Sequence, residues 1–105
     1  MKKPEDFVVI KEKTPNGVKF TLKGRIYANN ADILLSELDV TLKEGDYNIV
    51  LNMLWVEFLS SSGIRVILKG YKDAKKAGGS LRIEMPSENV KNVLGMVVLD
   101  ELLIK

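Results

Sequence analysis

The sequence contains neither cysteine nor histidine. It therefore cannot form disulfides, and it lacks both the usual zinc ligands and the commonest general base at neutral pH. Long apolar runs are also missing, and the charged residues 1–6 lead directly into a strand pattern, so we expect neither a signal peptide nor a membrane span. These absences weaken most enzyme interpretations. They predict a cytoplasmic protein that is not an enzyme and has no metal site and no cofactor.

Charge of one sign is not in excess either. The 16 Lys and Arg residues are nearly matched by 14 Asp and Glu residues, which leaves a formal net charge of +2. Because nucleic-acid-binding domains carry a strong and clustered basic bias, direct nucleic-acid binding is not expected. A chain of 105 residues, 46% of them hydrophobic, suffices for one core. We therefore expect residues 1–105 to form a single domain.

Hydrophobic periodicity at the start of the chain predicts a β-hairpin. Val18, Phe20 and Leu22 alternate with polar residues, as in a strand with one buried face, and residues 6–13 fit as its antiparallel partner. The intervening "TPNG" ends in Gly17, which tolerates a positive φ. We expect a tight turn with a bulge.

Helical spacing follows, beginning at a cap supplied by Asn29 or Asn30 and ending at "EGD", residues 44–46. The next apolar run, "IVL" at 49–51, does not alternate. A continuous run is typical of a central strand that is covered on both faces. We therefore predict a buried strand over 47–53 with helices on both sides of the sheet.

The second half of the chain predicts a parallel βαβ crossover. An apolar stripe places a helix over about 61–77, and "LRIEM" at 81–85 is the following strand. A short helix begins at "PS", residues 86–87, and residues 102–104 could add a last strand. The predicted fold class is α/β, with a mixed sheet of four to five strands, an N-terminal antiparallel hairpin and helices packed against the sheet.

The segment "FLSSSGI", residues 58–64, places three hydroxyl groups and a glycine where the apolar run gives way to the helix. One interpretation is structural, because a serine oxygen can cap the first helical turn. The other is functional. Open α/β sheets bind ligands and partners beyond the carboxyl ends of their strands, and a helix N-terminus there accommodates a phosphate. Gly63 would let a backbone approach closely.

A serine nucleophile is the rival chemistry, but it requires an adjacent base. Histidine is absent, and the sequence contains neither a G-x-S-x-G nor an S-x-x-K motif. Modification by a separate kinase demands only an exposed hydroxyl.

At this point the segment from Ile49 to Ile83 resembles the central part of STAS domains of the bacterial anti-sigma factor antagonist type. Such domains carry a loop ending in F-[ML]-D-S-S-G, a V-I-L-x-x-Y-K helix run, then G-G and a strand; here "FLSSSG" and "VILKGYK" occupy these places. The resemblance implies that Ser62, before the motif glycine, accepts a phosphate, with Ser61 the weaker alternative. It implies two partners, an anti-sigma factor with serine kinase activity and a serine phosphatase. The unphosphorylated form would bind the anti-sigma factor and so free a sigma factor.

The sequence departs from the family pattern in three places. Ser60 stands where the loop motif usually has an acid, and Tyr27 replaces a second acid that often follows strand two. Residues 96–99, "MVVL", lack the glycine usual after the third helix, and the chain stops before the C-terminal helix of many relatives. The loss of acids keeps a second interpretation open, a non-switching STAS scaffold or sensor module in which Ser62 is only a cap.

A basic stripe runs along the helix after the serines, because Arg65, Lys69, Lys72 and Lys76 recur at helical spacing. It could meet an acidic partner or be a solvated face. Trp55, expected in the loop before the motif, could anchor a partner, although closure of the end of the sheet is favoured. The residues expected to contact a partner are Ser60, Ser61, Gly63, Arg65, Lys69, Lys72, Asn29 and Asn30.

Overall fold

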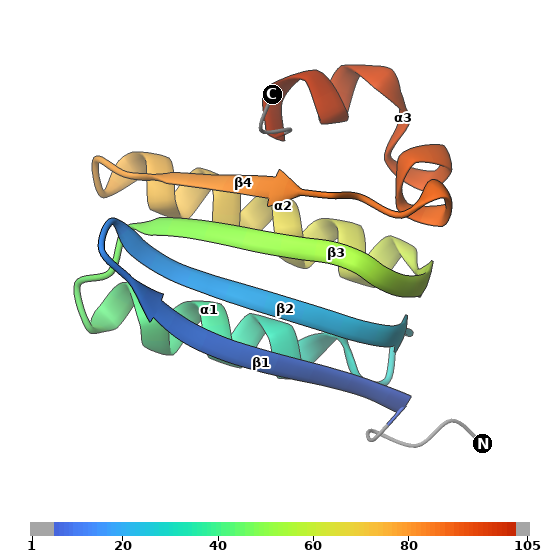
Figure 1. The fold of residues 1–105 in the computed structure, drawn as a ribbon, viewed down its shortest axis with the longest axis horizontal. Coiled ribbons are helices and arrows are strands. Elements are labelled where there is room, and N and C mark those ends of the chain that lie inside the picture. The colour runs from blue at the N-terminus through green and yellow to red at the C-terminus, as the bar shows by residue number, and fades with distance from the viewer. Residues whose placement is uncertain (1–5, 103–105) are drawn as a thin grey trace.

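The computed structural model describes residues 6–102, which form a four-stranded mixed sheet and three helices (Figure 1). The strand order is β1-β2-β3-β4; β1 is antiparallel to β2, and β2, β3 and β4 are mutually parallel. The predicted fold class is thus confirmed. In chain order the elements are β1 (Phe7–Thr14), β2 (Gly17–Ile26), α1 (Ala31–Lys43), β3 (Asn48–Leu59), α2 (Ser61–Lys76), β4 (Ser80–Glu84) and α3 (Glu88–Leu102).

The hairpin between β1 and β2 is tighter than predicted. The two strands pair without a break in register up to Thr14 and Gly17, so the expected bulge is absent. Gly17 is not among the residues with a positive φ. A Cβ atom there would overlap the carbonyl oxygen of Asn48. Glycine is needed at this position because β3 starts beside it, not because of the turn.

Only one face of the sheet is covered by α1 and α2, which lie side by side behind the strands in Figure 1. The buried residues of β2 are Val18, Phe20, Leu22 and Ile26, whereas the residues between them are half-buried or exposed. In β3, likewise, Ile49 and Leu51 are buried but Val50 between them is only half-buried. The prediction that the central strand is covered on both faces is therefore wrong. The apolar side chain of Val50 simply adds to an open face.

β3 is longer than predicted and contains Trp55, which the sequence pattern assigned to a loop. The register with β2 shifts between Thr21 and Lys23 and again between Gly24 and Arg25, which lets extra residues of β3 be accommodated as bulges. These bulges break the period of two, so the end of the strand could not be recognised from alternation. Trp55 lies opposite Lys23, is 57% exposed and does not close the end of the sheet.

α3 begins where β4 ends and covers the exposed edge of β3. The pairing of β4 with β3 stops at Asn52 and Glu84. Beyond it, the Ser87 N–H donates to the Met53 carbonyl (3.2 Å), and the Ser87 hydroxyl donates to the Val56 carbonyl (2.7 Å). The same hydroxyl oxygen accepts the N–H of Val90 (3.2 Å) and so caps the helix.

The last helix is longer than predicted and is kinked. Gly95 adopts a φ of 75° within α3, and this left-handed conformation divides it into two helical parts. Leu102, predicted to begin a last strand, ends α3 instead, and residues 103 and 104 lie outside the described residues.

Candidate functional site

The serine loop joins the carboxyl end of β3 to the start of α2. Ser60 is the N-cap residue, and its Oγ accepts the N–H of Gly63 (3.2 Å). Its own N–H donates to the carbonyl of Ile26 (2.9 Å), which holds the loop against the end of β2. The prediction that Ser60 or Ser61 caps the helix is confirmed for Ser60. One of the three hydroxyl groups is therefore committed to the fold.

Ser61 and Ser62 lie in the first turn of α2. Ser61 is exposed and Ser62 is half-buried. Within residues 6–102 no hydrogen bond of either hydroxyl is found, and the first turn of this helix carries no acidic side chain. Because the amides of a first helical turn point outward and carry partial positive charge, an anion attached to either serine would be stabilised there.

Gly63 is buried, and its small size serves helix packing. A Cβ atom on Gly63 would lie 2.6 Å from Cδ1 of Leu59 and 2.9 Å from Cγ2 of Ile26. The first turn of α2 therefore sits directly on the last residues of β2 and β3, which fixes the position of the serines. The approach expected at this glycine is made by the domain's own side chains, so Gly63 acts by placing the loop and offers no side chain to a partner.

The loop between β2 and α1 lies at the same end of the sheet, because β2 and β3 are parallel neighbours. Asn30 occupies the N-cap position of α1 but makes no side-chain capping bond, so its predicted role as a cap is wrong. It is fully buried; its Oδ1 accepts the N–H of Tyr27 (2.8 Å), and its Nδ2 donates to the carbonyl of Arg25 (3.0 Å). Asn30 thus holds the loop from inside, while Asn29 is exposed beside it.

A polar and aromatic cluster that the sequence pattern did not reveal lies at the ends of these two strands. Arg25 Nε donates to Glu57 Oε1 (3.2 Å), and the rings of Tyr27 and Phe58 have their centroids 5.2 Å apart. Hydrogen bonding to Tyr27 and, second, to Glu57 raises the pKa of the Arg25 guanidinium. Tyr27, at the position where the family resemblance implies an acid, therefore interacts with the neighbouring arginine. Strand register was needed to find this cluster, since its members are some 30 residues apart in sequence.

The basic stripe lies on the exposed side of α2. Arg65, Lys69, Lys72 and Lys76 are all exposed, and the opposite side of the helix packs on the sheet. Lys69 Nζ forms an ion pair with Asp73 Oδ2 at 2.7 Å, and this hydrogen bond raises the pKa of Lys69. Asp73 therefore neutralises part of the stripe, and its middle carries less net charge than the sequence spacing indicates.

Fold and site together define a small α/β module, with a serine-bearing helix start at the carboxyl edge of a mostly parallel sheet. The family model for the STAS domain matches residues 8–105, and the chain belongs to that family.

Solved structures with this fold include anti-sigma factor antagonists. The chain is similar to SpoIIAA in its unphosphorylated form, with 18% identity, a TM-score of 0.80 and coverage of 92% of this chain and 86% of that chain. The chain is also similar to an anti-sigma factor antagonist from Mycobacterium paratuberculosis, with 18% identity, a TM-score of 0.80 and coverage of 95% of this chain and 85% of that chain. With a putative anti-sigma factor antagonist from Thermotoga maritima it shares 22% identity and a TM-score of 0.75, with coverage of 90% of this chain and 82% of that chain. At these identities the likeness shows a shared fold.

The part of the chain that the structure describes contains neither a candidate membrane-spanning helix nor a candidate metal site. None of the three helices combines the length and the apolar character that crossing a membrane requires. Among residues 6–102, acidic side chains nowhere gather in threes in a way that could hold a metal ion.

Proposed function

We propose that the chain is an anti-sigma factor antagonist, a binding protein rather than an enzyme, whose association with its partner is controlled by phosphorylation of Ser62. The observation that carries this proposal is that the three serines of the loop have different structural roles. Ser60 caps α2, whereas Ser61 and Ser62 stand in an acid-free first turn at the edge of the sheet. Support also comes from SpoIIAA of Bacillus, a protein of this fold whose phosphorylated form is known and is similar to this chain with a TM-score of 0.77.

Phosphorylation would act at the interface and leave the fold intact. A phosphate adds about −1.5 to −2 charges at neutral pH. The start of α2 favours such a charge by about 0.3–1 kcal/mol when exposed. A partner surface fitted to a neutral hydroxyl would instead bury an unpaired charge, which costs several kcal/mol, or about a thousandfold in affinity.

The partners follow from this assignment. The unmodified form binds an anti-sigma factor that is also a serine kinase, and this binding frees a sigma factor; a serine phosphatase restores the unmodified form. The surface that we assign to the anti-sigma factor combines the exposed loop residues Ser61 and Asn29 with the basic stripe on α2. Gly63 and Asn30 support this surface from within the domain.

Incubation with the candidate kinase and ATP, followed by mass mapping, tests the acceptor. We expect one phosphate on Ser62, and none on Ser62→Ala. The matched control is Ser61→Ala, which changes the neighbouring and more exposed hydroxyl and should still be phosphorylated. Incorporation into Ser61 would move the switch by one residue. No incorporation by a kinase that is active on another antagonist would overturn the proposal.

The second candidate is a non-switching scaffold or sensor module, and Tyr27 and Ser60 favour it because they stand where the family resemblance implies acids, while Glu57 nearby is paired with Arg25. Binding to the anti-sigma factor separates the two functions. We expect Ser62→Asp to weaken binding of the anti-sigma factor by at least about tenfold relative to Ser62→Ala, because the aspartate places a charge in the interface. Equal binding of both variants would favour the scaffold.

A further inference from the structure

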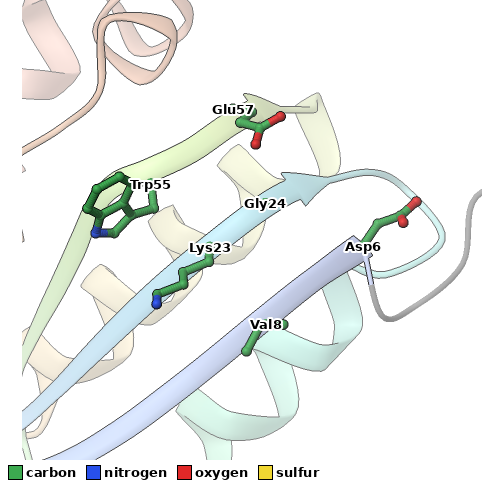
Figure 2. A pocket seen from close by; sticks show the side chains of 6 residues that line it. All are labelled: Asp6, Val8, Lys23, Gly24, Trp55 and Glu57. Atoms are coloured by element: carbon green, nitrogen blue, oxygen red, sulfur yellow. The ribbon is translucent and has the colours of Figure 1, made fainter.

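The face of the sheet that α1 and α2 leave open carries an exposed apolar patch. Val8 is 46% exposed, Ile10 is 42% exposed, and Trp55 is 57% exposed. Figure 2 shows Val8, Lys23 and Trp55 on this face, on three neighbouring strands, around a shallow pocket of about 410 Å³. Exposed tryptophan beside aliphatic side chains is the composition of an interaction surface, and tryptophan is enriched among the residues that dominate binding energy.

Strand register arranges this face in rows. One row contains Val8, Lys23 and Trp55. The next contains Ile10, Thr21, Asn52 and Glu84, and the third contains Glu12, Lys19, Val50 and Arg82. The third row begins with an acid on β1 and ends with a base on β4. Its inner cation, Lys19, is already paired with Glu84 at 3.1 Å.

We propose that the open face binds the same face of a second copy of this chain. The two copies are related by a two-fold axis that runs parallel to the strands, midway between the two sheets and over the gap between β2 and β3. Such an axis places β1 of one copy on β4 of the other and β2 on β3. Glu12 then meets Arg82 of the second copy, and Arg82 meets Glu12 of the second copy. Thr21 faces Asn52 of the second copy, and Lys23 faces the ring of Trp55 of the second copy, a cation–π arrangement.

The charge of the face favours a second copy over a strongly charged partner. The four cations Lys19, Lys23, Arg25 and Arg82 are balanced by the four acids Asp6, Glu12, Glu57 and Glu84. Two of these opposite charges, Arg25 and Glu57, are joined within the chain. A surface with no net charge does not repel its own copy. Glu12 on β1 complements Arg82 on β4, where the other charged residue of this face, Glu84, is already paired with Lys19.

The area of the face sets the expected strength. β1, β2 and β3 have at least eight residues each, but β4 has only five, so β1 of one copy and β4 of the other overlap over about five residues. With strands about 4.8 Å apart and about 3.3 Å per residue, the overlapping face is roughly 400 Å² per copy. The total of roughly 800 Å² is typical of weak interfaces, and aligned sheets pack face to face in this way. We therefore expect a weak, reversible dimer that becomes populated between about 1 and about 500 µM. This inference does not rest on the proposed phosphorylation.

Sedimentation equilibrium from about 1 to about 500 µM measures the dimer directly, and we expect a mass that rises from 11.8 kDa toward twice that value. Trp55 is the only tryptophan, so its emission should shift to shorter wavelength over the same range of concentrations. Trp55→Glu should weaken dimerisation by at least about tenfold. The matched control is Val40→Glu, which changes an exposed apolar side chain on α1. Unfolding by urea confirms that each variant is folded.

A charge exchange tests the two-fold register. Glu12→Arg places arginine against Arg82 of the second copy, and Arg82→Glu places glutamate against Glu12, so each variant alone should dimerise less well than the natural chain. An equimolar mixture of the two should form a heterodimer about as tight as the natural dimer, because both contacts then join opposite charges. A natural chain that stays monomeric up to about 500 µM, or a mixture no tighter than the separate variants, would overturn the proposal.

Discussion

The two faces of the sheet are built from alternate residues of the same strands, yet they serve different purposes. The face covered by α1 and α2 holds the core, in which Phe20, Leu22 and Leu51 are fully buried. The open face carries Trp55 and ion pairs such as Lys19 with Glu84. The covered face therefore determines the fold, and the open face remains available for association. The serine loop lies at the border between them, where Gly63 packs on the core and Ser61 is exposed.

The sharpest comparison uses two adjacent residues of β2 that point to opposite faces. Phe20 is 0% exposed, and Thr21 is half-buried on the open face. We expect Phe20→Ala to lower the free energy of unfolding by about 3–5 kcal/mol through lost burial and a cavity. Thr21→Ala should cost at most about 1 kcal/mol, the range of strand propensity. Urea denaturation of both variants measures the difference; similar losses would mean that the open face is also part of the core.

The contact between α2 and the covered face should break when Gly63 is enlarged. Gly63→Val adds atoms that must displace Leu59 and Ile26, and overpacking of this kind costs about 1–3 kcal/mol. The control is Ser61→Val, a β-branched residue on the exposed position of the same turn, which should cost much less. If both variants lost the same stability, helix propensity and not packing would be the cause.

The covered face was the more predictable one. The alternation of Val18, Phe20 and Leu22 predicted β2, and helical spacing predicted α1 and α2. When only one face of an element is buried, apolar residues recur along the sequence with the period of that element. The continuous run around Val50 was misinterpreted for the opposite reason. An apolar residue on an open face costs little, so the sequence need not mark that face as polar.

The candidate site was predicted in part. The capping serine could be expected from local hydrogen bonding, and Ser60 performs that role. The contacts of Asn30 are local, within five residues of the chain, whereas the pair of Arg25 with Glu57 depends on which strand ends are neighbours and on two irregularities of register. Sequence spacing cannot supply that information, because bulges shift side chains between faces without a local signal of their own.

In the serine loop, Ser60→Ala should remove the cap of α2 and lower the free energy of unfolding by about 1 kcal/mol. Ser61→Ala should leave stability nearly unchanged because the hydroxyl of Ser61 has no capping bond. Thermal unfolding of the two variants distinguishes a serine that holds the fold from one that is available for modification. A loss for Ser61→Ala as large as that for Ser60→Ala would contradict this division.

The smallest effect is expected farthest from the sheet, at the pair of Lys69 and Asp73 on the exposed side of α2. The pKa of Lys69 is raised chiefly by its hydrogen bond to Asp73, with a weaker contribution from the charge of Asp39. A raised lysine pKa stabilises the fold at every pH below the unfolded-state value near 10.5, and this contribution is lost as the pH rises through the folded-state value. Stability near neutral pH should therefore be insensitive to this titration.

NMR titration of the Lys69 side chain gives the measurement. Asp73→Asn should lower the pKa of Lys69 toward its ordinary value but not completely, because Asp39 remains, and Asp39→Asn should lower it less. The stability difference between Asp73→Asn and the natural chain should be small at neutral pH, because an exposed pair is screened by solvent, and should disappear above the alkaline transition. An Asp73→Asn chain with an unchanged Lys69 pKa would show that this side of α2 is solvated throughout, with the stripe carrying its full charge toward a partner.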